Sequence, residues 1–152
     1  MRGLVRVGAA APSLALGNVK ENMKRHLAMM REAKEKHVSI VTFPELSLTG
    51  YTCGDLFFQR RLLDDVTDAL LALKDEMPEG ILAVVGAPLE IEGALYNCAV
   101  VLHKGEIISA VPKTFLPNNG EFYEKRWFQS GDARRDASVS YTHLTLPTSD
   151  LV

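Results

Sequence analysis

Apolar and polar positions alternate with two different periods along the first half of the chain. Short apolar runs rich in β-branched residues occupy 4–9, 38–43 and 81–86, and a proline or glycine lies near the end of each. Runs of this kind are typical of buried strands. Between them, apolar side chains recur every three or four positions over 19–37 and 62–77, which predicts two amphipathic helices. Strand, helix and strand at this spacing predict right-handed βαβ units with parallel strands.

The first predicted helix carries its own start signal. Asn18 is a good N-cap, and Glu21 follows three residues later, as in a capping box. His26 falls on the apolar face of this helix, where a histidine is usually part of the core, so no chemistry is assigned to it.

The pattern changes after residue 86. Residues 89–92 alternate, and further apolar runs at 95–102 and 107–111 are separated by tight turns at Gly93 and at 104–106. Short turns between such runs predict an antiparallel meander. We therefore expect an α/β domain whose sheet is parallel in its first part and antiparallel in its second.

Composition and charge narrow the range of partners. The chain has 152 residues, of which 47% are hydrophobic and 24% charged, and its formal net charge is −2. These values predict one soluble domain that binds neither nucleic acid nor a membrane. Residues 1–7 lack the apolar core of a signal peptide, so a cytoplasmic location is expected. Cys53 and Cys98 are not spaced as metal ligands and are predicted to be free thiols, with no metal site.

Two charged residues directly follow predicted strands. Glu45 comes after the strand 38–43 and Pro44, and Lys113 comes after the strand 107–111 and Pro112. Reactive groups in parallel sheets gather at the carboxyl ends of strands. A capping or surface role for Glu45 is as consistent with its position as a catalytic one, and Lys113 taken singly is explained as a solvated charge.

The two strand-end motifs, 43–51 and 112–124, together resemble the nitrilase superfamily of carbon–nitrogen hydrolases, over about residues 4–131. The continuations at 52–57 and 124–128 are similar to the amino-terminal glutaminase domain of glutamine-dependent NAD synthetases. This resemblance implies a partial α-β-β-α nitrilase-type sandwich. Residues 1–135 would then be the amino-terminal part of the hydrolase domain. Residues 136–152, rich in serine and threonine, are expected to be a non-native or artefactual tail.

The superfamily uses a Glu-Lys-Cys triad, which implies roles for several residues here. Glu45 matches the general base, Lys113 the catalytic lysine, and Glu121 the second glutamate that helps hold the lysine. The positions that match the lining of the glutamine pocket are Tyr51, Asn119 and Phe122. Neither Cys53 nor Cys98 lies in the sequence context of the nucleophile. We therefore expect that this chain lacks the nucleophilic cysteine and is a truncated fragment that is inactive alone.

The resemblance also implies a function. It is hydrolysis of the glutamine amide, releasing ammonia for the ATP-dependent amidation of deamido-NAD to NAD. The hydrolase step needs no cofactor, whereas ATP and Mg²⁺ belong to a synthetase domain missing from this chain. The implied partners are glutamine, that synthetase domain and, at full length, further copies of the same protein. Two alternatives stay open: a stand-alone amidase or carbamoyl hydrolase of the same superfamily, and a scaffold with no enzymatic activity.

Overall fold

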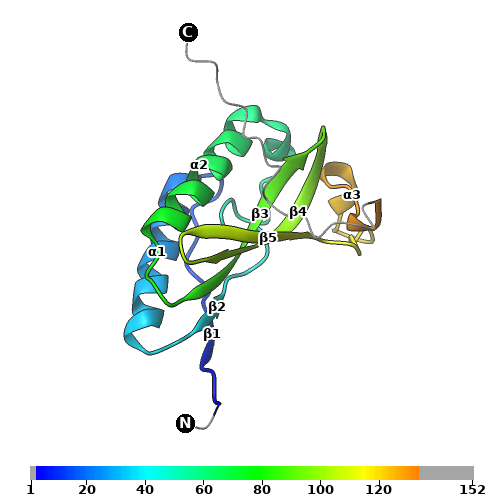
Figure 1. The fold of residues 1–152 in the computed structure, drawn as a ribbon. Coiled ribbons are helices and arrows are strands. Elements are labelled where there is room, and N and C mark those ends of the chain that lie inside the picture. The colour runs from blue at the N-terminus through cyan, green and yellow to red at the C-terminus, as the bar shows by residue number, and fades with distance from the viewer. Residues whose placement is uncertain (1–2, 134–152) are drawn as a thin grey trace.

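The computed structural model describes residues 3–133 as a single five-stranded sheet with two long helices side by side on one of its faces (Figure 1). The strands are β1 (Val7–Ala9), β2 (Ile40–Thr42), β3 (Leu82–Ile91), β4 (Ala94–His103) and β5 (Glu106–Pro112). The helices are α1 (Val19–Glu35), α2 (Arg60–Glu76) and the short α3 (Glu124–Trp127), and two 3₁₀ turns are η1 (Gly54–Phe58) and η2 (Gly131–Ala133).

The sheet follows the chain order β1-β2-β3-β4-β5. β1 pairs with β2 and β2 with β3 in parallel, whereas β3, β4 and β5 pair antiparallel. The parallel pairs are joined through α1 and α2, and the antiparallel pairs through tight turns. The predicted βαβ units and the predicted meander are therefore both confirmed.

Two details of the strands differ from the prediction. The runs 81–86 and 89–91 belong to one strand, because every residue of β3 pairs with β4 from His103 back to Ala94. The first strand is short and lies at the edge of the sheet, and its first residue, Val7, is 67% exposed. The expectation of a buried first strand is thus wrong, because β1 has a single neighbouring strand and packs little against the rest of the fold.

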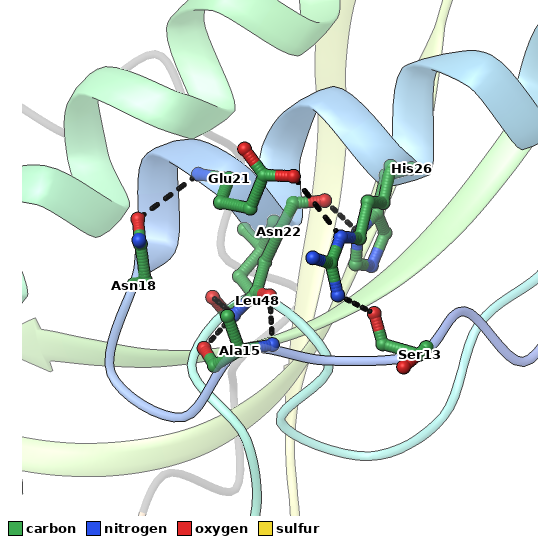
Figure 2. A network of polar contacts seen from close by, with 8 residues as sticks. Ser13, Ala15, Asn18, Glu21, Asn22, His26 and Leu48 are labelled. Atoms are coloured by element: carbon green, nitrogen blue, oxygen red, sulfur yellow. Dashed lines mark hydrogen bonds and ion pairs between the residues drawn. The ribbon is translucent and has the colours of Figure 1, made fainter.

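The two helices supply most of the apolar layer on the covered face of the sheet. α2 buries Leu62, Val66 and Leu73, as its periodicity predicts. α1 starts where Asn18 caps the backbone N–H of Glu21, with 3.2 Å between nitrogen and oxygen (Figure 2). The Glu21 side chain binds Arg25 at 3.2 Å, so only one half of the capping box forms.

Within residues 3–133, no helix is long and apolar enough to cross a membrane. Cys53 and Cys98 are both free thiols, as predicted. The expected tail at 136–152 lies outside the described residues.

Candidate active site

Three charged side chains from separate parts of the chain meet at one edge of the sheet. The Nζ of Lys113 lies 2.8 Å from Oε1 of Glu45 and 3.1 Å from Oε1 of Glu124. Glu124 is 2% exposed, whereas the side chains of Lys113 and Glu45 are 28% and 39% exposed. The fold thus brings together Glu45 and Lys113, which are 68 residues apart in sequence.

The position of Glu45 depends on a close approach between its loop and β3. The loop begins where β2 ends, and Leu46 takes a left-handed backbone conformation with φ of 53°. A Cβ built on Gly86 of β3 would lie 2.8 Å from the carbonyl carbon of Glu45, and closer still to main-chain atoms of Pro44 and Leu46. Only a glycine at position 86 lets the loop lie this close to the strand.

A buried network of hydrogen bonds to α1 and β3 holds the same loop in place. The Ser47 hydroxyl oxygen accepts from the N–H of Gly86 at 3.2 Å and contacts Nε2 of His26 at 2.8 Å. Nδ1 of His26 lies 2.7 Å from the carbonyl oxygen of Asn22 and therefore donates to it (Figure 2). Burial lowers the pKa of His26, although the bond to Asn22 opposes this change. A neutral His26 then accepts from the Ser47 hydroxyl, which satisfies every group in the chain of contacts.

Asn22 extends this network to the loop before α1 and to the loop after β2. Its side chain is fully buried and bonds the main chain of Ala15 through both its oxygen and its nitrogen, and its nitrogen also donates to the carbonyl of Leu48 at 3.0 Å (Figure 2). The prediction that His26 belongs to the core is confirmed. The sequence did not reveal that it supports the Glu45 loop through Ser47.

Lys113 is placed by the meander. Its N–H donates to the carbonyl of Asn97 on β4 at 2.7 Å, immediately after Pro112 ends β5. Partial burial lowers the pKa of Lys113, but hydrogen bonds to Glu45 and Glu124 outweigh it, so the net pKa is raised. The side chain is therefore an ammonium at neutral pH, aimed between two carboxylates.

Glu124 is the most enclosed charge of the site. Its Oε1 accepts from Lys113 and also from the Tyr51 hydroxyl, at 2.8 Å. Its Oε2 is buried and has no hydrogen-bond partner among the residues that the structure describes. Burial and the bond to Glu124 together raise the pKa of Tyr51 to about 12, so this hydroxyl remains a donor at neutral pH.

The structure places Glu124, and not Glu121, against the lysine. Glu121 is exposed on the loop before α3, and the carboxylates within hydrogen-bonding distance of Lys113 in the described chain are Glu45 and Glu124. The expectation that Glu121 holds the lysine is therefore corrected. Glu124 opens the turn of α3 and lies four positions before the buried Phe128, so both face inward. That i, i+4 pairing is the signal in the sequence that separates the two glutamates.

The three residues predicted to line a glutamine pocket have different surroundings. Tyr51 points to Glu124, as described above. Asn119 and Phe122 are exposed and share a main-chain turn, in which the N–H of Phe122 donates to the carbonyl of Asn119 at 3.1 Å. Their contact with a substrate stays a prediction.

A clamp between η1 and α3 fixes the turn that carries Glu124. The carboxylate of Asp55 accepts from Nε and Nη2 of Arg126, at 2.8 and 2.9 Å, and from the indole N–H of Trp127, at 3.0 Å. These bonds hold the pKa of Asp55 well below its ordinary value. Behind the clamp, the Phe57 ring packs on that of Phe128 with a centroid separation of 5.0 Å.

A cleft of about 360 Å³ lies beside the charged cluster. Its volume is at the lower end of the range of small-molecule sites. The lining comes from the loop after β2 and from β3, β4 and the end of β5, and it consists of Phe43, Pro44, Glu45, Val84, Val85, Gly86, Asn97, Cys98, Ala99, Val111, Pro112 and Lys113.

Neither cysteine of the described chain has the surroundings of a nucleophile. Cys98 lines the cleft, but burial raises the pKa of its thiol to about 12. Burial also raises the pKa of Cys53, whose thiol donates to the carbonyl of Thr49 at 3.3 Å. A raised pKa leaves little thiolate near neutral pH, and the thiolate is the reactive form. Within residues 3–133, no group of three or more His, Cys, Asp or Glu side chains is arranged to hold a metal ion.

Several known proteins are similar to this chain in sequence. The glutamine-dependent NAD(+) synthetase of Mycobacterium tuberculosis is 40% identical over 157 residues, covering 98% of this chain and 23% of that enzyme. The enzyme of the same name from Xylella fastidiosa is 33% identical, over 85% of this chain and 24% of its own length. The chain thus spans about a quarter of the length of these curated relatives.

Solved structures give the same result. A glutamine-dependent NAD(+) synthetase from Cytophaga hutchinsonii superposes with a TM-score of 0.79 at 32% identity, over 83% of this chain and 22% of that one. An amidase from Nesterenkonia sp. superposes with a TM-score of 0.71 at 20% identity, over 86% of this chain and 49% of that one, which supports the shared fold alone.

The family model named carbon-nitrogen hydrolase matches residues 5–145, which is most of the chain. Together with the meeting of Glu45 and Lys113, this match identifies the chain as a member of the carbon-nitrogen hydrolase family.

Proposed function

We propose that this chain forms part of a glutaminase site that hydrolyses the side-chain amide of glutamine and supplies ammonia for the ATP-dependent amidation of deamido-NAD to NAD. The observation that carries this proposal is the ammonium of Lys113, held between Glu45 and Glu124. The similarity to glutamine-dependent NAD(+) synthetases supports the choice of glutamine over other amides.

Glu45 is the general base in this proposal. An amide carbon is a weak electrophile, so a thiolate must attack it and form a thioester. Glu45 accepts the proton of the thiol as the carbon–sulfur bond forms, and then donates it to the leaving nitrogen, which departs as ammonia. Glu45 next accepts a proton from the water that attacks the thioester, and returns it to the sulfur as the carbon–sulfur bond breaks, so that glutamate leaves and the thiol and the Glu45 carboxylate are regenerated. Removing a general base typically costs a factor of about 10² to 10⁴ in rate.

Lys113 stabilises the negative charge of the two tetrahedral intermediates. The raised pKa of Lys113 keeps it protonated throughout the reaction. Because its Nζ is already bound on two sides, little reorganisation is needed when the oxyanion appears. The loss of one such donor typically costs a factor of about 10² to 10³ in the catalytic rate constant.

Glu124 takes the role that the sequence suggested for Glu121. Its buried carboxylate fixes the direction of the Lys113 ammonium, and Tyr51 in turn orients that carboxylate. We keep Tyr51, Asn119 and Phe122 as proposed contacts of glutamine.

The nucleophile of the proposed reaction is a cysteine other than Cys53 and Cys98. Both thiols are buried and have raised pKa values, which supports this exclusion. We therefore propose that the 152-residue chain does not turn over glutamine by itself. The hydrolase step uses no cofactor, and ATP and Mg²⁺ serve a synthetase domain with which the site works. Homo-oligomerisation and a cytoplasmic location complete the proposal, and the two free thiols are in keeping with a reducing compartment.

A chimera tests the function directly. Residues 1–133 of this chain replace the matching segment of the Mycobacterium tuberculosis enzyme, and NAD formation is measured with glutamine or with ammonium chloride as the nitrogen source. We expect both to support synthesis. The substitutions Glu45→Gln and Lys113→Met should each lower the rate of the glutamine-dependent reaction by a factor of at least about 10². The rate of the ammonia-dependent reaction should stay unchanged.

Matched controls separate the alternatives. Glu124→Gln should impair glutamine use, whereas Glu121→Gln, at an exposed position, should not. The proposal fails if glutamine use survives Glu45→Gln. Hydrolysis of small amides or carbamoyl compounds with indifference to glutamine would favour the stand-alone amidase instead. Ammonia release from glutamine by the unmodified 152-residue chain would refute its proposed inactivity.

A further inference from the structure

Asn97 touches both halves of the charged pair. It lies on β4, the residue is almost fully buried at 3% exposed, and it lines the same cleft as Glu45 and Lys113. Its Nδ2 donates to Oε1 of Glu45 at 2.5 Å, and its main-chain carbonyl accepts from the N–H of Lys113 at 2.7 Å. A single residue of the sheet therefore links two loops that are distant in sequence.

The contacts distinguish the two oxygens of the Glu45 carboxylate. Oε1 accepts from both the amide of Asn97 and the ammonium of Lys113. In the part of the chain that the structure describes, neither of these contacts involves Oε2. A carboxylate held by two donors at one oxygen has a fixed plane, and its second oxygen keeps its lone pairs for a proton.

Burial explains why an asparagine is suited to this position. A buried side-chain amide without a partner is costly, so Asn97 is held to its contact with Glu45 by its own need for an acceptor. Lys113 alone would leave Glu45 free to rotate about the ion pair, since a lysine is a point charge on a flexible stem. The planar amide adds the directional constraint that the lysine lacks.

We propose that Asn97 is a positioning residue that fixes Oε1 of Glu45 beside Lys113, so that Oε2 is the oxygen presented to the attacking thiol and, later, to water. The role given to Oε2, as the oxygen that accepts the proton, rests on the proposed function. The other part of the proposal, that Asn97 acts on Lys113 through Glu45, can be tested without any enzymatic activity.

The test is a double-substitution cycle read out at Lys113 in the 152-residue chain. The rate at which trinitrobenzenesulfonate labels Lys113 at pH 9 is measured by peptide mass spectrometry, and this rate reports the free amine. Asn97→Ala should raise the rate at least about threefold, because a loosely held Glu45 stabilises the ammonium less. In a Glu45→Ala background, adding Asn97→Ala should change the rate no further. Asn118→Ala, at an exposed asparagine, is the control and should leave the rate unchanged.

Two outcomes of this labelling experiment overturn the proposal. One is an unchanged labelling rate in Asn97→Ala. The other is an equal increase in the presence and absence of Glu45, which would show that Asn97 acts on Lys113 through the main chain of β4. Circular dichroism checks that each variant is folded, and Asn97→Leu, which preserves volume, replaces Asn97→Ala if the latter unfolds.

Hydrogen exchange of the Asn97 side-chain amide tests the proposal without a substitution at Asn97. The side-chain amide protons of Asn97 should exchange with solvent at least about tenfold more slowly than those of Asn118, and Glu45→Ala should remove this protection. Equal exchange rates in the two asparagines of the unmodified chain would refute the proposal. The labelling and exchange measurements do not depend on glutaminase activity. The positioning role of Asn97 can therefore be tested even if the chimera does not use glutamine.

Discussion

Replacing Gly86 by alanine should displace the Glu45 loop. The added Cβ would lie within 3.0 Å of main-chain atoms of Pro44, Glu45 and Leu46, and a main chain cannot rotate away as a flexible side chain can. The loop is also bound to this residue, because the N–H of Leu48 donates to the carbonyl of Gly86 at 3.0 Å.

The expected magnitude follows from these contacts. Overpacking of this kind costs about 1–3 kcal/mol. Two hydrogen bonds are strained with it, from Leu48 to Gly86 and from Gly86 to Ser47, at about 1 kcal/mol each. We therefore expect Gly86→Ala to lower the free energy of unfolding by about 3–5 kcal/mol, which is a large part of the stability of a typical domain.

Urea denaturation followed by circular dichroism measures this change. A lower midpoint with an unchanged m-value indicates lost stability without a change in the surface exposed on unfolding. Gly8→Ala is the matched control, since its added Cβ would meet the Val38 side chain at 3.4 Å, an ordinary contact, within the same sheet. A free energy of unfolding for Gly86→Ala within about 0.5 kcal/mol of the Gly8→Ala value would refute the packing of the Glu45 loop on β3.

Two further predictions concern the clamp and the thiols. Because Arg126 and Trp127 lower the pKa of Asp55, the clamp stabilises the fold above the ordinary pKa of an aspartate and is lost as the pH falls through the lowered value. Asp55→Asn should therefore lower the melting temperature at pH 7, and the difference from the unmodified chain should shrink below about pH 3 in thermal scans; a constant difference would contradict the clamp. Because burial raises the pKa of both Cys53 and Cys98, neither should react quickly with Ellman's reagent at pH 8, and both should react after unfolding in urea. Rapid labelling of one thiol in the folded chain would show a reactive cysteine that the structure does not predict.

Local pattern in the sequence was sufficient to predict the two long helices and the order of the strands. The 3.6-residue spacing of apolar side chains defined α1 and α2, since a helix with one apolar face can bury that face only against a sheet or another helix. The order of strands and helices also predicted a parallel half and an antiparallel half of the sheet, because the length of each connection limits how two strands can pair. Glu45 and Lys113 are candidates from the sequence because each comes just after a predicted strand. That position alone did not give them a catalytic role, which was implied by the resemblance of the surrounding motifs to the nitrilase superfamily.

The tertiary structure decided which other side chains join that pair. The distance in sequence from Lys113 does not by itself separate Glu121 from Glu124. The i, i+4 spacing of Glu124 and Phe128 does so only once α3 has formed, and the packing of α3 against η1 turns Glu124 inward. The role of Asn97 and the need for a glycine at 86 likewise depend on contacts between segments that are far apart in sequence. The periodicity of apolar residues shows which face of a helix or strand is buried, but not which residues it is buried against. Which atoms meet across two loops depends on the positions of every element between them, and a linear pattern does not contain those positions.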